Sequence, residues 1–249
     1  MKAKFYTRFG KIWCDALVAL VGLLLLSPLL LVIAVAVRLS SPGPALFSQI
    51  RTGQFGKPFR ILKFRTMRVA PEGSGSLLTA SGDPRITPLG HWLRKTKMDE
   101  LPQLFNVLAG HMSLVGPRPE VPLYTARYSD RQKRVLRVRP GVTSPQIEFD
   151  EEAMMAAHPD KEGFYLNDIL PAKLEVGLAY CDRIRFLEDQ RIILRTASQV
   201  LRTILGGLRP TSSRLGDPAS FAGQKPSVST PAIISRTSES CSAADSPPR

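Results

Sequence analysis

The residues best suited to chemistry in this 249-residue chain lie between Lys97 and Pro119, in the segment KMDELPQLFNVLAGHMSLVGPRP. Two adjacent carboxylates, Asp99 and Glu100, open a stretch with the apolar spacing of a helix, which predicts Asp99 as its N-cap. Capping is the ordinary role of such a pair, and the helix dipole would keep Asp99 ionised there. Arg118 follows between two prolines, which predicts a fixed, fork-shaped phosphate ligand. Two carboxylates beside a fixed guanidinium are the groups that phosphoryl transfer needs.

A helix is predicted over residues 88–97, directly before the carboxylate pair. Thr87 is its expected N-cap and a proline its first residue, which is a favoured arrangement at a helix start. Arg94 would then lie close to the turn that carries the carboxylates. Asp83 and Arg85 precede this helix in a turn, where a structural salt bridge is the simpler interpretation.

Residues 49–67 have the glycines and alternating apolar positions of a short extended hairpin. Lys63 and Arg65 alternate in it and would share one face of a strand. A solvated basic face is the commoner fate of such a pair. Further along, the sequence predicts a basic amphipathic helix at 120–137, a short helix at 151–157 and mostly helical structure at 165–205.

An apolar run from Ala16 to Val37, broken only by Ser27 and Pro28, is long enough to cross a bilayer once. It exceeds the usual core of a cleaved signal peptide, about 7–15 residues. Two interpretations stay open, a single span and a helix-break-helix that enters and leaves by the same face. Basic residues flank both ends, and the break divides the run into halves of roughly 13–17 Å, close to one leaflet each.

Composition limits the partners and the compartment. The net charge of +13 predicts anionic partners, and only 7% of the residues are aromatic. Because neither zinc-finger spacing nor an arginine-rich recognition helix is present, nucleic acid is not expected. Cys14, Cys181 and Cys241 are scattered, which argues against a disulfide framework and fits a reducing compartment. Residues 206–249, rich in Ser, Pro, Gly and Ala, are predicted to form a disordered tail.

The segment DELPQLFNVLAGHMSLVGPRP closely resembles the signature of the bacterial monotopic phosphoglycosyl transferases, or sugar transferases, and the resemblance continues to about Leu205. Family members transfer a sugar phosphate from a nucleoside-diphosphate sugar to a polyprenyl phosphate through an aspartate. The resemblance implies Asp99 as the nucleophile and Glu100 as a catalytic carboxylate that holds Mg²⁺. Ser144 departs from the glycine that many members have there. The residues expected to contact substrate are Lys63, Arg65, Asp83, Arg85, Arg94 and Arg118.

The resemblance also implies an architecture. It is an α/β, mainly α, monotopic membrane protein with a re-entrant helix-break-helix in residues 1–39, broken at Ser27 and Pro28. A small catalytic domain with short strands and amphipathic surface helices follows in 40–205, on the cytoplasmic face of the bacterial inner membrane. UDP-sugar, undecaprenyl phosphate and anionic lipid are the expected partners, while the sugar and the oligomeric state stay open. The rival hypotheses are a non-catalytic, basic membrane-anchored adaptor and a sugar transferase without a covalent intermediate.

Overall fold

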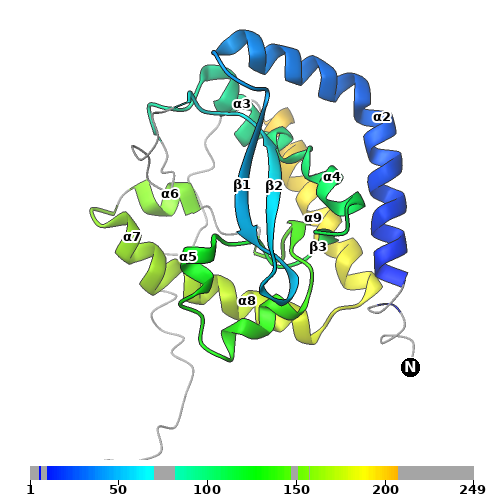
Figure 1. The fold of residues 1–249 in the computed structure, drawn as a ribbon, viewed down its shortest axis with the longest axis vertical. Helices are drawn as coiled ribbons and strands as arrows, with labels where there is room; N and C mark the ends of the chain where they lie inside the picture. Colours follow the sequence, from blue (N-terminus) through cyan, green and yellow to red (C-terminus); the bar gives the residue numbers. More distant parts are fainter. Residues whose placement is uncertain (1–5, 7–9, 70–81, 147–150, 157, 207–249) are drawn as a thin grey trace, which may run out of the picture. The chain divides into compact units, whose positions relative to one another are not determined.

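The computed structural model describes residues 6, 10–69, 82–146, 151–156 and 158–206, which are mainly helical with a few short strands. The chain begins with a long apolar helix and ends with two further long helices, and short helices, 3-10 turns and strands lie between them (Figure 1). In order, the elements are α2 (Lys11–Ser40), β1 (Leu46–Thr52), η2 (Gln54–Gly56), β2 (Pro58–Phe64), α3 (Pro88–Lys95), η3 (Met98–Glu100), α4 (Gln103–Leu108), β3 (Ser113–Val115), α5 (Pro122–Thr125), η4 (Gln132–Arg137), β4 (Gly141–Thr143), α6 (Glu151–Ala156), α7 (Lys161–Phe164), η5 (Tyr165–Ile169), α8 (Leu170–Asp182) and α9 (Phe186–Leu205).

Helix α2 is continuous through the predicted break but changes direction along its length (Figure 1). Pro28 has no N–H to bond the carbonyl of Leu24, four residues earlier. The hydroxyl of Ser27 donates to that carbonyl at 2.8 Å and so replaces the hydrogen bond that Pro28 cannot make. By length and composition α2 is the one helix in the described residues that could cross a membrane.

Both halves of α2 pack against the rest of the protein. In the first half, Ala19 is completely buried in a cluster with Phe59 and Ile61 of β2 and with residues of and after α4. In the second half, Ile33 and Val37 pack with Phe64 of β2 and with α3. The remaining surface of α2 is a broad exposed apolar face, which includes Leu17, Val21, Leu24, Leu25, Leu31, Val32, Val35 and Leu39.

Polar contacts fasten the amino end of α2 to the helices at the other end of the chain. The ammonium group of Lys11 and the hydroxyl groups of Tyr6 and Tyr180 all donate to the carboxylate of Asp189 in α9. Asp189 is only 2% exposed, so this is a buried and fully engaged charge. Asp15 accepts a hydrogen bond from the hydroxyl of Ser113 at the start of β3.

The strands position the loops around the candidate site. β1 and β2 form an antiparallel hairpin, as predicted, in which Leu46 pairs with Phe64 and Phe47 with Lys63. β3 and β4 form a second, parallel pair that the sequence did not indicate. The largest core cluster lies between α5, η4, η5 and α8, where Tyr124, Tyr165 and Leu174 are buried.

Two predicted features turn out differently or fall outside the described residues. The segment 120–137 is not one amphipathic helix, because α5 ends at Thr125 and a turn separates it from η4. Ser129 and Gln132 bond to each other across that turn, and Tyr124, Tyr128 and Val135 point into the core rather than toward a membrane. The predicted disordered tail beyond Gly206 lies outside the described residues.

Candidate active site

Asp99 and Glu100 lie in the 3-10 turn η3, and both carboxylates are buried. The chain enters the turn through Lys97, whose φ of 57° is left-handed, and α4 starts only at Gln103. The prediction that Asp99 is the N-cap of a helix is therefore wrong. The residue at the cap position is Pro102, which has no side-chain acceptor, so neither carboxylate is engaged in capping.

Glu100 is held between two cations. Its Oε1 accepts a hydrogen bond from the ammonium of Lys63 at 2.8 Å and another from the guanidinium of Arg118 at 3.0 Å. Burial raises the pKa of Glu100, but the charges of Arg118 and Lys63 outweigh that effect and hold the pKa well below its usual range. Glu100 is thus an ionised carboxylate whose charge is already compensated.

Asp99 has a different environment from its neighbour. Its Oδ1 is buried, and no described residue gives it a hydrogen bond. Burial, followed by the negative charge of Glu100, raises the pKa of Asp99 to about 6, while the charges of Lys63, Lys97 and Arg94 oppose the rise. Asp99 is therefore mostly ionised at neutral pH without help from a helix dipole, and it keeps a free oxygen.

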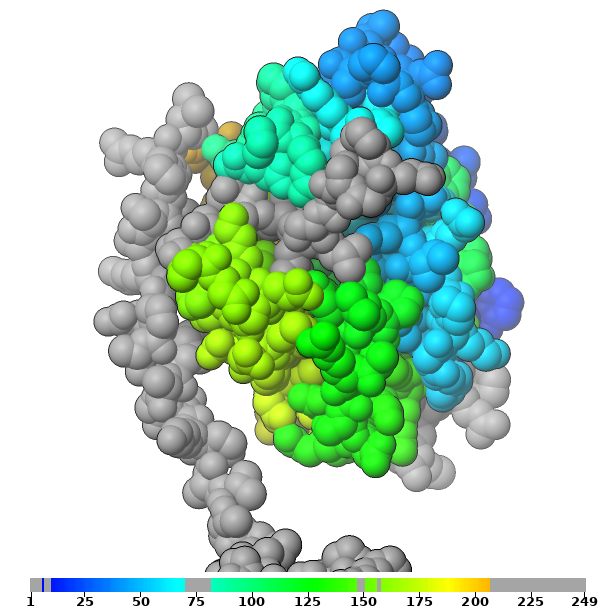
Figure 2. All heavy atoms as spheres, turned by 60° about the vertical axis from the view of Figure 1, so that its left-hand side comes forward, coloured from blue at the N-terminus to red at the C-terminus, as the bar shows by residue number. Residues whose placement is uncertain are grey.

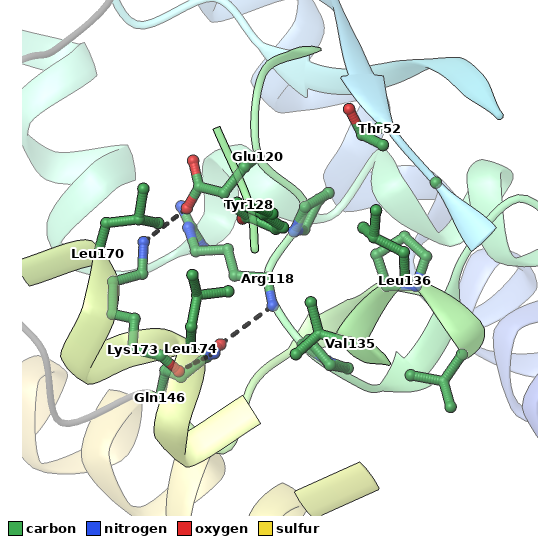
Figure 3. A pocket seen from close by; sticks show the side chains of 15 residues that line it. Thr52, Arg118, Glu120, Tyr128, Val135, Leu136, Gln146, Leu170, Lys173 and Leu174 are labelled. Atoms are coloured by element: carbon green, nitrogen blue, oxygen red, sulfur yellow. Dashed lines mark hydrogen bonds and ion pairs between the residues drawn. The ribbon is translucent and has the colours of Figure 1, made fainter. Parts of the chain in front are cut away.

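Arg118 is fixed by its backbone as well as by its two flanking prolines. Its N–H donates to Oε1 of Gln146 at 3.1 Å, and the amide of Gln146 donates in turn to the carbonyl of Lys173 at 2.6 Å (Figure 3). The negative charge of Glu100 raises the pKa of Arg118, which stays protonated. The prediction of a fixed guanidinium beside the carboxylate pair is confirmed.

Behind Arg118 lies a buried charge cluster that the sequence reasoning missed. Lys173, 2% exposed, donates to Glu120 at 2.7 Å (Figure 3). Lys173 also donates to Glu151 at 2.8 Å, and Tyr165 donates to Glu120. The charges of Glu151 and Glu120 act on Arg118. The signal in the sequence was a lone lysine in the apolar run of α8, between Leu170 and Leu174.

Arg65 does not join Lys63 at the carboxylates. Its guanidinium is buried and donates to the carbonyls of Pro42 at 2.7 Å, Ser41 at 2.7 Å and Val37 at 3.2 Å. These carbonyls lie at the carboxyl end of α2, where a helix lacks internal donors. Arg65 thus fastens the end of α2 to β2, and its phosphate contact stays a prediction.

The remaining predicted substrate residues form ion pairs near the site. Asp83 and Arg85 are paired with each other at 2.6 Å, which confirms the salt bridge in a turn. Arg94 in α3 pairs with Glu152 in α6, and its positive charge lowers the pKa of Asp99. Figure 2 shows the surface on which α3, α6 and α7 are exposed. Substrate contacts of these three residues stay a prediction.

A divalent cation would find one or two carboxylates here rather than a complete ligand set. Within the described residues, no group of three His, Cys, Asp or Glu side chains could hold a metal. The unpartnered Oδ1 of Asp99 and the adjacent Glu100 nevertheless fit Mg²⁺, which binds proteins through one or two carboxylates and takes its other ligands from substrate phosphates.

Several proteins with named activities are similar in sequence to this chain. A UDP-glucose:undecaprenyl-phosphate glucose-1-phosphate transferase of Caulobacter vibrioides is 36% identical over 200 residues, which are 76% of this chain and 68% of the relative. An enzyme of the same designation from Escherichia coli is 45% identical over 132 residues, 52% of this chain and 28% of the relative. A UDP-N-acetylgalactosamine-undecaprenyl-phosphate N-acetylgalactosaminephosphotransferase of Aeromonas hydrophila is 42% identical over 146 residues, 54% of this chain and 33% of the relative.

The matched part of the chain thus spans about a third or less of two of these relatives. The model of one family, described as bacterial sugar transferase, matches residues 6–203, which include the whole described core from α2 to near the end of α9. The buried Asp99–Glu100 pair, the cations around it and the apolar helix α2 all lie within this match. The chain belongs to the bacterial sugar transferase family.

Proposed function

We propose that this protein transfers a sugar-1-phosphate from a UDP-sugar to undecaprenyl phosphate, in two steps through Asp99. The named activities of the relatives support the donor and acceptor classes. One observation carries the assignment of roles. Of two adjacent buried carboxylates, Glu100 is neutralised by Lys63 and Arg118, whereas Asp99 keeps an unpartnered Oδ1.

In the first step, a carboxylate oxygen of Asp99 attacks the phosphorus that carries the sugar. The bond from that phosphorus to the oxygen of UMP breaks, and UMP leaves with the electron pair. In the second step, a phosphate oxygen of undecaprenyl phosphate attacks the same phosphorus, and the Asp99 carboxylate is regenerated. The product is a polyprenyl-diphosphate sugar, the first membrane intermediate of a polysaccharide or glycoconjugate.

The cations of the site reduce the repulsion between an anionic nucleophile and an anionic diphosphate. Lys63 and Arg118 already lie within hydrogen-bonding distance of Glu100, so phosphate oxygens placed beside Glu100 would meet both donors. Arg118 has further donors in a planar fork, which suits two phosphate oxygens at once. Glu100 keeps both cations oriented and charged before the substrate arrives.

Mg²⁺ would be held by Glu100 together with Asp99 or with substrate phosphates, and it would supply further charge neutralisation at the diphosphate. The structural support is the free oxygen of Asp99 next to a second buried carboxylate. Lys63 and Arg118 would neutralise negative charge from the protein side. They bind Oε1 of Glu100, the oxygen opposite the one left for Mg²⁺, or the substrate itself.

We also infer that α2 is re-entrant and that the catalytic domain lies on the cytoplasmic face of the inner membrane. The amino end of α2 is fastened through Lys11 to Asp189, and its carboxyl end through Arg65 to the carbonyl of Ser41. A helix that crossed a hydrocarbon core of about 30 Å would place these ends on opposite sides of the membrane. One folded domain cannot bind both ends in that case. The change of direction along α2 and the hydrogen bond of Ser27 beside Pro28 support the same topology.

The proposed function is tested by UMP release. The purified full chain, in detergent or nanodiscs containing undecaprenyl phosphate, is incubated with a panel of UDP-sugars, and UMP is measured. Release with one or a few sugars, dependent on the lipid phosphate for repeated turnover, is the expected result. If no UDP-sugar yields UMP while the protein binds anionic vesicles, the adaptor hypothesis replaces the enzyme. Turnover without an acid-stable or trapped phosphosugar on Asp99 would favour direct transfer.

A further inference from the structure

An apolar groove lies where α2 ends and the chain turns into β1. Its volume is about 480 Å³, within the range of small-molecule sites. One wall comes from the last turns of α2 and the other from the segment that leads into β1. The apolar side chains of the two walls are Ala34, Val35, Leu39, Pro44, Ala45 and Leu46.

The groove adjoins the candidate active site through two elements. On the strand side, Leu46 pairs with Phe64, and the next pair along the hairpin joins Phe47 to Lys63, the residue that binds Glu100. On the helix side, Ala34 packs in the same cluster as Met98, the residue directly before Asp99. An occupant of the groove would therefore lie beside the residues that carry the carboxylate pair.

Among the residues that the structure describes, Arg38 is the one charged residue that lines the groove. Its side chain is exposed, and no ion pair joins it to another residue in the described part of the chain. The walls continue into the exposed apolar face of α2, which includes Leu31, Val35 and Leu39. A ligand that fits both features has an apolar chain next to an anionic group.

We propose that this groove binds the first isoprene units of a polyprenyl monophosphate and that Arg38, at its rim, attracts the phosphate. The inference rests on the proposed function, since it identifies where the acceptor lipid binds. A phosphate monoester carries between one and two negative charges at pH 7, whereas the diester of a phospholipid carries one. Arg38 as the single cation of the groove, and the proximity of the groove to Lys63, both favour the polyprenyl monophosphate, because this is the lipid that has to reach the carboxylates.

The test uses a substitution that fills the groove and a matched one that does not. Val35, 50% exposed, lines the groove, whereas Val32, 64% exposed, is on α2 outside it. Val35→Trp should weaken binding of undecaprenyl phosphate about tenfold, since the loss of two buried methylene groups accounts for that factor. Val32→Trp should leave binding unchanged. Binding is measured by native mass spectrometry of the full chain in detergent, with undecaprenyl phosphate or phosphatidylglycerol as the probe.

A charge variant gives a second measurement. Arg38→Gln should also weaken binding of undecaprenyl phosphate, while Arg60→Gln, an exposed arginine of β2, serves as its control. Unchanged binding in both Val35→Trp and Arg38→Gln overturns the proposal. Equal binding of phosphatidylglycerol, lost in the same variants, overturns it too, because the groove is then a general phospholipid site. Failure of the proposed function appears separately, as absent UMP release by a wild-type protein that still binds the lipid.

Discussion

The ammonium of Lys63 lies 2.8 Å from Oε1 of Glu100, and this contact, together with Arg118 on the same oxygen, makes the two adjacent carboxylates unequal. Burial lowers the pKa of Lys63, yet the charge of Glu100 counteracts that effect. With Arg118 on the same oxygen, Glu100 is compensated and Asp99 is not. The proposed division between a supporting and a reacting carboxylate therefore rests on two cations, Arg118 and Lys63 of β2, that both bind Glu100.

Asp99→Asn should abolish transfer without loss of the fold. The amide has nearly the same shape but cannot form the phosphosugar ester. Because the pKa of Asp99 is raised in the folded protein, its ionised form costs stability above about pH 6, and the neutral amide should raise the melting temperature by a few degrees. UMP release and a thermal shift assay check the two effects. Substantial turnover by the purified variant would exclude Asp99 as the nucleophile.

The rate should fall in acid because the nucleophile must be ionised. With the pKa of Asp99 at about 6, kcat/KM should drop roughly tenfold per pH unit below that value. Lys97→Gln removes a positive charge that lowers this pKa, so its pH profile should shift to higher pH. Lys95→Gln, an exposed lysine of α3, is the control and should not shift it. A profile that is flat down to pH 5, or one that Lys97→Gln moves toward acid, would contradict the assignment.

Removal of Mg²⁺ by EDTA should stop turnover, and added Mg²⁺ should restore it. Glu100→Gln should also cripple the rate, but with a structural signature of its own. Lys63 and Arg118, whose side chains are 20% and 39% exposed, lose their shared anion, so stability should fall by less than the about 3–5 kcal/mol of a fully buried pair. A melting temperature measured beside the rate separates this loss from loss of the metal. An unchanged rate in EDTA would make the metal-assisted scheme wrong.

Arg118→Lys should cost activity while leaving the protein folded, since a point charge can keep the pair with Glu100 but not bind two phosphate oxygens.

Arg65→Met should do the opposite. It leaves three carbonyls at the end of α2 without their donor, so stability should fall by several degrees while the KM for the UDP-sugar stays near wild type. Arg60→Met, on the exposed side of β2, is the control. A large rise of donor KM in stable Arg65→Met would return Arg65 to the substrate.

Both ends of α2 should be accessible only from the cytoplasm. After replacement of the native cysteines, a single cysteine at residue 3 should resist an impermeant reagent added to intact cells. Replacing Ser27 and Pro28 together with leucine should straighten α2 and expose residue 3, and activity should fall because the fastening of α2 to Asp189 is broken. Labelling of the unaltered amino end from outside would establish a spanning helix. Reversed topology with full activity would separate the bend from catalysis.

The sequence predicted those elements that depend on local chemistry. Thr87 caps α3 by accepting the N–H of Gly90 at 2.9 Å, and Ser27 compensates for Pro28, since each acts within one turn of helix. It failed where a side chain is used at long range. Nothing near Arg65 in sequence indicates that its partners are the carbonyls at the end of α2, more than 20 residues earlier. Lys173 likewise depends on Glu120, 53 residues away.

The attachment of α2 at both ends has a consequence for how this protein can be handled. A fragment that starts after Ser40 would leave Phe59, Ile61, Phe64 and Leu93 without the apolar residues that cover them. It would also remove the ammonium of Lys11 from the buried carboxylate of Asp189 and the carbonyl of Val37 from the guanidinium of Arg65. Such a fragment should aggregate rather than yield a soluble catalytic domain. Because α2 must be kept and its outer face is apolar, the protein needs detergent or nanodiscs to stay folded, and not only to reach a lipid substrate.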